Sequence, residues 1–265
     1  MTEAGGLLRE WRQRRRMSQL ELALAAGVSA RHVSLVETGR STPSADMVLR
    51  LAERLDVPLR DRNRLLLAAG HAPRYRERPL DGQGLAAAHR AVAAVIRAHE
   101  PYPAVVIDRR WNVVMANRVL ERFLEGVDPA LLRPPVNMLE LGLHPQGLRS
   151  RIANLDQVRA VLRARLSRQL ERTRDPELAA LYEAYLAPGV ADGEGGVPVE
   201  DEITTPMVIR HGRRELRLFS TVTTFGTPQD ITLEEVSIES YYPVDAATEA
   251  ALHALAADRT ADPGL

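Results

Sequence analysis

The strongest constraint on the fold of this chain is a closely spaced series of helix-start and helix-stop signals near its N-terminus. Ser18 and Glu21 form a capping-box pattern, in which each side chain accepts a hydrogen bond from the other residue's backbone N–H. Gly27 predicts a left-handed helix end, and Ser29 predicts the cap of a further helix two residues later. Gly39 predicts the end of that helix. The pattern therefore predicts two short helices joined by a tight turn.

Apolar periodicity on both sides of this pair extends the prediction to an all-α domain of five helices within residues 6–70. The expected helices cover about residues 6–15, 19–26, 30–37, 44–55 and 59–69. Their apolar positions are Leu7, Leu8, Trp11, Leu20, Leu22, Ala23, Ala26, Val33, Val36, Met47, Val48, Leu51, Leu55, Leu65, Leu66 and Leu67. In the second helix we expect Leu20 to face inward together with Leu22 and Ala23. In the first, we expect Arg12 to point away from the apolar face.

Two short helices joined by a glycine-containing turn are typical of the helix-turn-helix motif. The run from Ser18 to Ser44 resembles the lambda-repressor-like (XRE-type) DNA-binding domain. The matching positions are Ser18, Gln19, Leu22, Ala23, Gly27, Val28, Ser29, Val33, Glu37, Gly39, Arg40, Pro43 and Ser44. The resemblance implies that double-stranded DNA is a partner. A helix-turn-helix that serves only protein interaction is the alternative.

The resemblance places the helix after Ser29 in the major groove, with its first turn toward the base edges. Arg31 is then the best candidate for a direct reader, because its guanidinium can form two hydrogen bonds with guanine O6 and N7. Gln19 resembles the family's phosphate-contacting glutamine. The expected DNA-contacting residues are Gln19, Ser29, Ala30, Arg31, Ser34, Arg40, Ser41 and Thr42.

The charge of the chain is divided between its two parts. The whole sequence has 35 basic and 35 acidic residues, but residues 1–80 carry fifteen basic and nine acidic side chains, a net charge of +6. The remaining residues carry twenty and twenty-six, a net charge of −6. All 35 basic residues are arginine, which suits phosphate and guanine recognition, although a GC-rich genome produces the same bias. The positive charge coincides with the predicted DNA-binding domain.

Composition excludes several classes of protein. The absence of cysteine excludes disulfides, thiol nucleophiles, cysteine-based zinc sites and iron–sulfur clusters. No uncharged run approaches the roughly 20 residues that a transmembrane helix needs. The N-terminus does not have the pattern of a signal peptide. We therefore expect a cytoplasmic protein without a membrane span.

A Pro-, Gly- and Arg-rich stretch, residues 71–84, predicts a linker to a second domain over residues 85–257, followed by a tail over residues 258–265. The second domain is expected to begin with a helix at 85–100, a strand–turn–strand at 104–117 and a helix containing Leu120, Phe123 and Leu124. Two helices at 148–172 and 176–186 and a loose Gly-rich segment at 188–198 are expected next. The last expected elements are a hairpin at 206–225 that turns at His211 and Gly212, a strand at 231–242 with a bulge at Glu234 and Glu235, and a closing helix capped by Asp245. We expect Trp111, Val113 and Met115 to share one face of the second strand.

This order resembles a PAS-type α+β sensor domain with an antiparallel sheet, and also the ligand-binding domain of MmyB-like regulators. The residues that carry the resemblance are Val105, Val106, Ile107, Asp108, Trp111, Asn112, Asn117, Asn137, Met138 and Leu139, together with the closing hairpin. The chain departs from the family pattern in lacking an arginine-rich extension inside the helix-turn-helix.

The resemblance implies a small, largely apolar effector such as a fatty acid. The expected cavity residues are Trp111, Met115, Phe123, Met138, Leu141, Leu162, Leu218 and Phe225, with Asn117, Asn137, His144 and Arg149 as polar anchors. An apolar stripe of this kind also fits an ordinary core. A C-terminal domain that only pairs subunits therefore stays open as an alternative.

The chain lacks the patterns of the common catalytic and metal sites. No two of its seven histidines lie four residues apart, and there is no phosphate-binding GxxxxGK[ST], no GxGxxG after a strand and no GxSxG. We expect neither a catalytic site nor a metal site, and no cofactor beyond the apolar ligand. The predicted function is a homodimeric, sequence-specific transcriptional regulator. An enzyme with a DNA-binding appendage is the remaining alternative.

Overall fold

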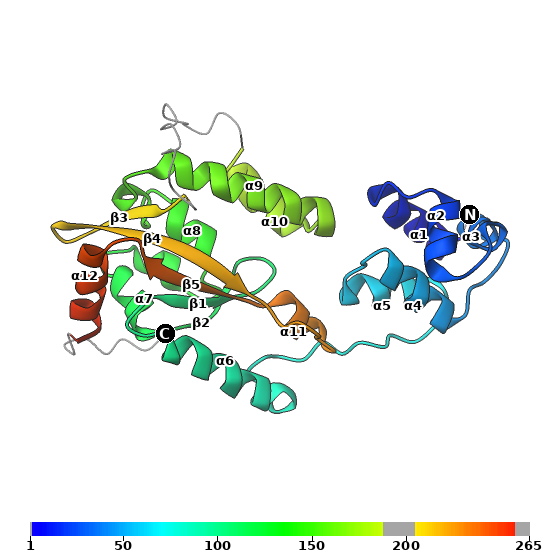
Figure 1. Cartoon of the computed structure of the whole chain (residues 1–265), viewed down its shortest axis with the longest axis horizontal. Coiled ribbons are helices and arrows are strands. Elements are labelled where there is room, and N and C mark those ends of the chain that lie inside the picture. The colour runs from blue at the N-terminus through cyan, green and yellow to red at the C-terminus, as the bar shows by residue number, and fades with distance from the viewer. Residues whose placement is uncertain (1, 188–204, 258–265) are drawn as a thin grey trace. The chain divides into compact units, whose positions relative to one another are not determined.

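The structure, a computed structural model, describes residues 2–187 and 205–257 (Figure 1). The chain forms two compact units. The first comprises residues 1–85 together with residues 225–234, and the second comprises residues 86–224 and 235–265. The predicted loose segment at 188–198 and the predicted tail lie outside the described residues.

Five helices form the first unit, as predicted. They are α1 (Glu3–Arg14), α2 (Gln19–Ala26), α3 (Ala30–Thr38), α4 (Ala45–Arg54) and α5 (Leu59–Ala68). Between them lies one apolar core, in which Leu22, Val33 and Leu51 are fully buried.

The predicted helix ends in this unit are confirmed. Ser18 and Glu21 form both hydrogen bonds of the capping box, and Gly27 ends α2 in the left-handed conformation at φ +65°. The Ser29 hydroxyl accepts a hydrogen bond from the His32 N–H at 3.1 Å. Gly39 ends α3 at φ +78°, where a side chain would be strained.

Two predictions about the interior of this unit are wrong. Leu20 was expected inward but is 58% exposed, because an eight-residue helix can turn only one narrow face inward and Leu22, Ala23 and Ala26 occupy it. Arg12 was expected to point away from the core but is only 9% exposed. Its burial depends on an acidic partner from α3, described below.

The second unit is an α+β domain. Its helices are α6 (Ala86–Ala98), α7 (Arg118–Phe123), α8 (Met138–Leu143), α9 (Leu155–Thr173), α10 (Pro176–Tyr185) and α12 (Ala246–Ala257). Its strands are β1 (Ala104–Ile107), β2 (Val113–Ala116), β3 (Met207–His211), β4 (Arg214–Thr223) and β5 (Ser237–Pro243). The short α11 (Ile231–Glu235) and 3₁₀ turns at Gln83–Leu85, Pro129–Leu132 and Arg149–Arg151 complete the described elements.

The five strands form one antiparallel sheet, as predicted, and their order across it is β2-β1-β5-β4-β3. The last strand in sequence therefore lies at the centre, between β1 and β4. Its register places Ile238 opposite Val106 of β1 and Tyr241 opposite Ser220 of β4. The β3–β4 hairpin turns at Gly212 and Arg213, one residue later than predicted, and His211 pairs with Arg214.

Three predicted elements differ in the structure. Residues 231–235 form a helix rather than the start of a strand, so the change of apolar parity marks a helix–strand junction and not a bulge. The long helix begins at Leu155 rather than Leu148, because a 3₁₀ turn precedes it. Trp111 lies in the β1–β2 turn at φ +68° instead of continuing the alternation of β2.

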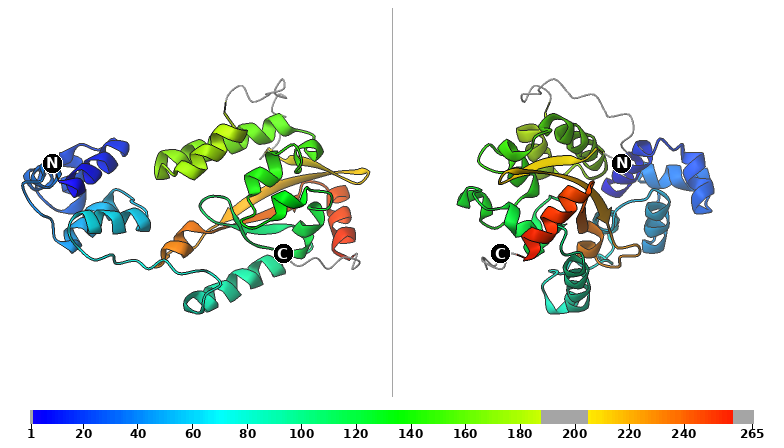
Figure 2. Two further views of the ribbon diagram at one scale, coloured as in Figure 1. Left: turned by 180° about the vertical axis from the view of Figure 1, so that it is seen from behind. Right: turned by 60° about the vertical axis from the view of Figure 1, so that its left-hand side comes forward.

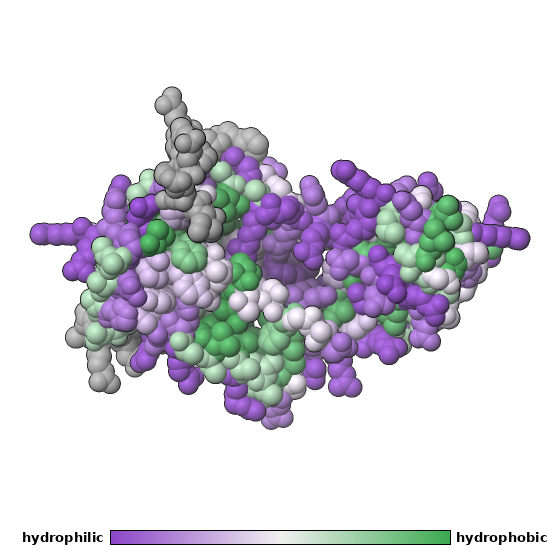
Figure 3. Space-filling model, in the orientation of Figure 1, coloured by the Kyte–Doolittle hydropathy of each residue, from purple (hydrophilic) through white to green (hydrophobic). Residues whose placement is uncertain are grey.

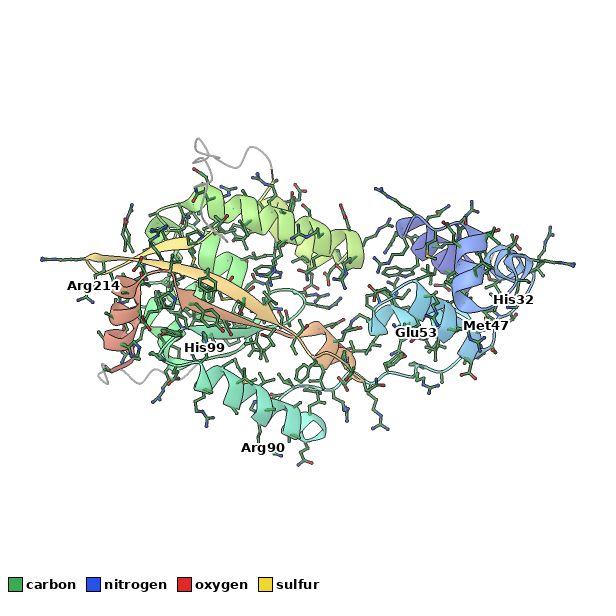
Figure 4. The ribbon with its side chains drawn as sticks, viewed as in Figure 1. His32, Met47, Glu53, Arg90, His99 and Arg214 are labelled. Atoms are coloured by element: carbon green, nitrogen blue, oxygen red, sulfur yellow. The ribbon has the colours of Figure 1, made fainter. Side chains whose placement is uncertain are left out.

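Helices cover the sheet in separate groups (Figure 2). Buried leucines of α8, α9 and α10, including Leu139, Leu166 and Leu178, pack in one cluster with β1. Helix α12 packs against β4 and α7 in another cluster. At the end of α6, His99 Nε2 lies 2.8 Å from the Tyr241 carbonyl oxygen of β5 (Figure 4).

Within the described residues, no helix combines the length and the hydropathy that crossing a bilayer requires.

Candidate DNA-binding surface and cavity

The exposed face of α3 is the candidate DNA-reading surface. Val33 and Val36 of this helix are buried in the core, whereas Arg31 is exposed and Ala30 and Ser34 are half-buried. The first turn of α3 therefore presents one cation and two small side chains. Small side chains beside a cation allow the helix to approach base edges closely in the major groove.

The other predicted DNA contacts surround this helix. Gln19 is the first residue of α2, and Arg40, Ser41 and Thr42 lie in the loop between α3 and α4. Arg40 and Thr42 are exposed, and Ser41 is half-buried. The Gln19 amide nitrogen donates to Glu37 at 2.8 Å, so the side chain is already oriented by the protein.

A buried ion pair holds α1 against α3. Arg12 Nε donates to Glu37 Oε1 at 2.6 Å and Arg12 Nη2 donates to Oε2 at 2.9 Å, while Nη1 donates to the Met17 carbonyl oxygen. Glu37 is 2% exposed. Its hydrogen bonds and negative charge raise the pKa of Arg12. Glu37 lies four residues after Val33 on the inward face of α3, and this position was the sequence signal for a buried acidic partner.

A cavity of about 160 Å³ lies in the second unit. Residues from the sheet, from α7, α8 and α9 and from the loops between them line it, and most are apolar. The lining residues are Pro103, Trp111, Leu120, Phe123, Met138, Leu139, Gly142, Leu143, Leu148, Ile152, Val158, Val161, Leu162, Arg165, Thr205, Met207, Ile209, Leu218, Ser220, Glu239 and Tyr241.

Five of the predicted apolar residues line this cavity, and three do not. The structure brings together Trp111, Phe123, Met138, Leu162 and Leu218. Met115 lies on β2 away from the lining, Leu141 packs in a separate cluster with Leu124, Val127 and Val136, and Phe225 belongs to the first unit.

The predicted polar anchor Asn117 is absent from the cavity lining and is instead buried as a structural cap of α7. Its Oδ1 accepts from the Leu120 N–H and the Ala104 N–H, both at 3.1 Å. Its Nδ2 donates to the carbonyl oxygens of Tyr102 and Ile96. The protein itself therefore uses the hydrogen-bonding capacity of this amide.

Asn137 and His144 have comparable local roles at the two ends of α8. Asn137 Oδ1 accepts from the Leu139 N–H at 3.0 Å, and its Nδ2 donates to the Arg110 carbonyl oxygen at 2.8 Å. His144 Nδ1 accepts from the Gln146 N–H at 3.1 Å. Neither residue lines the 160 Å³ cavity. Arg149 lines a different pocket, between α9 and α10.

Sequence reasoning missed the charged groups that do line the cavity. Arg165 of α9 pairs with Glu239 of β5, and Tyr241 donates from its hydroxyl to Glu239 Oε2 at 3.1 Å. The Arg165 guanidinium also stacks over the Trp111 ring, 4.3 Å from its centroid. Burial, together with the adjacent Glu239 carboxylate, raises the pKa of Tyr241 well above its usual value, so its hydroxyl stays protonated. The sequence signal was a glutamate between the apolar residues of a central strand.

The connection between β4 and β5 contributes to the first unit. Within that unit, the Leu59 N–H at the start of α5 donates to Glu234 Oε2 at 2.7 Å, while Pro58 at the N-cap supplies no side-chain acceptor. The buried Asp230 carboxylate pairs with Arg78 of the predicted linker at 2.8 Å. A segment that leaves one strand of the sheet and returns to another therefore caps a helix of the helix-turn-helix domain.

The next residue, Glu235, belongs to the second unit. Its carboxylate lies 3.6 Å from Arg109 Nε, in the same β1–β2 turn that carries Trp111. Arg109 also pairs with Asp175 at 3.0 Å. The β1–β2 turn, whose Trp111 lines the cavity, therefore forms an ion pair with Glu235, the residue that follows Glu234 in the chain.

Among the residues that the structure describes, no group of three or more His, Asp or Glu side chains is arranged to hold a metal ion.

No curated protein matches the chain. A solved structure of an RNA-binding light-oxygen-voltage receptor is similar at 12% sequence identity and a TM-score of 0.29, over 97% of this chain. This chain spans 62% of that receptor's length.

Two family models match adjoining parts of the chain. A helix-turn-helix model matches residues 8–61, which include α2 and α3. A model described as the ligand-binding domain of MmyB-like transcription regulators matches residues 88–255, which include the whole sheet and the cavity. Because the second match alone covers more than half of the sequence, the chain belongs to the family of MmyB-like transcription regulators, with a DNA-binding helix-turn-helix followed by a ligand-binding domain.

Proposed function

We propose that this regulator binds a specific DNA site through α3 and changes its affinity for that site when a small apolar molecule, such as a fatty acid, occupies the cavity. The observation that carries the proposal is the mainly apolar cavity of about 160 Å³ within the ligand-binding domain. At about 30 Å³ for each water-sized group, such a volume has room for about five of them. A short acyl chain is of this size.

The DNA-binding part of the proposal has the geometry of related helix-turn-helix domains. Helix α3 lies in the major groove with Arg31 toward a guanine, and Gln19 and Arg40 contact phosphates. One such helix reads only a few base pairs, so we propose that a homodimer binds a palindromic site.

Arg31→Ala is expected to relax base preference at one position of each half-site, at a cost of about 1–3 kcal/mol, because the bidentate contact with guanine is lost. Gln19→Ala should weaken binding to all sequences more evenly, because a phosphate contact carries no base information. Selection of bound sequences from random DNA, followed by titrations at fixed salt, measures both effects.

Arg90→Ala is the matched control, because it also removes one exposed arginine but from α6, in the other unit (Figure 4). Its DNA binding should equal that of the wild type. Unchanged sequence preference in Arg31→Ala and unchanged affinity in Gln19→Ala would contradict this docking.

Gly142→Phe is expected to abolish ligand binding while leaving the domain folded. Gly142 lines the cavity, and a Cβ added there meets no atom within 4 Å, so a larger side chain has open space to enter. Replacing a helical glycine also removes a destabilising residue, worth about 0.5–1 kcal/mol relative to alanine. Native mass spectrometry of gently purified protein should find a retained small molecule in the wild type and none in this variant.

Gly142→Ala is the control for the same position, because it adds only one methyl group and leaves most of the cavity free. It should retain the ligand. Equal retention by the wild type and Gly142→Phe would place the ligand elsewhere, and repeated absence of any bound molecule from the wild type would count against a ligand in this cavity.

Subunit pairing is the second candidate function of the C-terminal domain. Helix α6 favours it, because Ala91, Ala94, Val95 and Ala98 are exposed and give this part of the surface an apolar character (Figure 3). Sedimentation of the Val95→Glu variant tests it. Dissociation of a wild-type dimer by this substitution would assign α6 to pairing.

We propose that ligand occupancy reaches the DNA-binding domain through the β4–β5 connection. Both strands line the cavity, at Leu218 and Ser220 on β4 and at Glu239 and Tyr241 on β5. Residues 225–234 between them belong to the first unit and cap α5 through Glu234. In this proposal, a strand shift on ligand binding changes the cap of α5, and the connection would then be the element that both sites bias.

A further inference from the structure

We infer that the ligand carries a carboxylate at its polar end, and that Arg165 of α9 holds this carboxylate at the mouth of the cavity. The inference rests on the proposed ligand-binding function, and it specifies the charge of the ligand, its orientation and the residue that recognises it. The hydrocarbon tail then lies inside the cavity, while the carboxylate stays near solvent.

The cavity has a mouth where its lining residues reach solvent. Val161 of α9 is 48% exposed although it lines the cavity, and Ser220 of β4 is exposed as well. Other lining residues, such as Phe123 and Leu218, are at most 3% exposed. Arg165 lies one helical turn after Val161 on the same face of α9, and its side chain is 30% exposed. The lining therefore changes from a buried apolar interior to a partly solvated mouth that carries a guanidinium.

One edge of the Arg165 guanidinium is not used by the rest of the protein. Its Nη1 donates to Glu239, and its plane lies over the Trp111 ring. Among the residues that the structure describes, none accepts a hydrogen bond from its Nε or its Nη2. These two nitrogens form the edge that binds a carboxylate through two parallel hydrogen bonds, as the same edge of Arg12 does with Glu37 in the first unit.

This protein already places two carboxylates on one guanidinium at other positions. Arg110 donates from Nε to Asp175 at 3.0 Å, and its Nη1 lies 2.6 Å from a Glu177 oxygen. Arg109 pairs with Asp175 through Nη1 and with Glu235 through Nε. The ion pair at the mouth is therefore compatible with a ligand carboxylate on the unused edge of its guanidinium.

A carboxylate gains more from this mouth than an uncharged polar end does. Hydrogen bonds between ionised partners are roughly twice as strong as hydrogen bonds between neutral groups. At the mouth the carboxylate also keeps part of its hydration, so its desolvation penalty is smaller than it would be inside the cavity. Arg165 is the only cationic residue on the described lining, so a preference for carboxylates depends on it.

The test compares hexanoate with 1-hexanol, which share an alkyl chain and differ in the charge of the polar end. Isothermal titration calorimetry of delipidated full-length protein at pH 8 measures both affinities. We expect the wild type to bind hexanoate about tenfold or more tightly than 1-hexanol. Glu239→Gln keeps the cation and removes the competing carboxylate, so it should bind hexanoate at least as tightly as the wild type does.

Arg165→Gln combined with Glu239→Gln removes both charges and leaves no unpaired ion behind. Its hexanoate affinity should fall about tenfold or more, while its 1-hexanol affinity changes less than about threefold. The matched control is Arg210→Gln combined with Glu215→Gln, which makes the same two substitutions in an exposed pair. The control should leave both affinities unchanged.

Equal binding of the two compounds by the wild type, or a preference for hexanoate that survives in the Arg165→Gln, Glu239→Gln variant, would overturn the inference while leaving the cavity as a ligand site. The wild-type comparison decides even if that variant does not fold, because the described lining carries no other cation. Failure of both compounds to bind the wild type would overturn the proposed ligand function, and this inference with it.

Discussion

Glu37→Ala is expected to destabilise the helix-turn-helix domain by about 3–5 kcal/mol and to abolish specific DNA binding under ordinary conditions. The substitution leaves the buried Arg12 guanidinium without its carboxylate and removes the acceptor of the Gln19 amide. The free-energy cost of a buried cation without a partner is far larger than the net stabilisation that the ion pair provided, because the cation still bears its full desolvation penalty. Since stabilities of small domains are about 5–15 kcal/mol, this loss is a large share of the total.

Urea unfolding monitored by Trp11 fluorescence measures this effect, in a Trp111→Phe background so that only the first unit is observed. The combined variant Arg12→Met with Glu37→Leu removes both charges and should recover most of the lost stability, because apolar residues of similar size can replace a buried pair. Glu53→Ala, at an exposed position of α4 (Figure 4), should change the stability by no more than about 0.5 kcal/mol. A small effect of Glu37→Ala would mean that water reaches Arg12.

Glu234→Ala is expected to abolish the effect of ligand on DNA affinity while preserving both binding activities. Its carboxylate caps α5 at the Leu59 N–H, and α5 has no side-chain cap of its own. Loss of a helix cap costs about 0.5–2 kcal/mol, which is too little to unfold a typical domain. The covalent connection from β4 to β5 remains, but its hydrogen bond to the start of α5 is lost. DNA titrations with and without saturating ligand measure the ratio of the two affinities.

Glu234→Gln provides the matched control, because its amide oxygen can still accept from the Leu59 N–H. It should retain most of the ligand response. Glu53→Ala should retain all of it. A full response in Glu234→Ala, with ligand binding intact, would show that the coupling takes another route.

Local backbone chemistry made the first unit predictable from sequence. A serine cap or a left-handed glycine acts on residues within one turn of itself, so Ser18, Gly27, Ser29 and Gly39 predicted the helix ends before any packing was known. The same local logic predicted the β3–β4 turn to within one residue and the Asp245 cap of α12, whose carboxylate accepts from the Thr248 N–H at 2.7 Å.

Local patterns failed where a residue's environment comes from distant parts of the chain. Residues 231–235 have the apolar content of a strand, yet they form a helix, and residues 231–234 of it belong to the first unit. Asn117 and Asn137 have the chemistry of ligand anchors, but nearby backbone groups use their amides as helix caps. Each amide also has a partner on another element, the Ala104 N–H for Asn117 and the Arg110 carbonyl oxygen for Asn137, and no spacing rule predicts those contacts.

The sequence by itself determined the order of the two domains, the helix-turn-helix with its capped helices, the charge difference between the domains and most strands of the antiparallel sheet. These features depend on residue type and on short-range periodicity. Only the tertiary structure decided which polar groups meet: Arg12 with Glu37, Arg165 with Glu239, and Glu234 with the start of α5. Each pair joins residues at least 25 positions apart. Folding, and not sequence spacing, brings such charges together. Because they are buried, losing one partner of a pair costs much more free energy than it would at the surface.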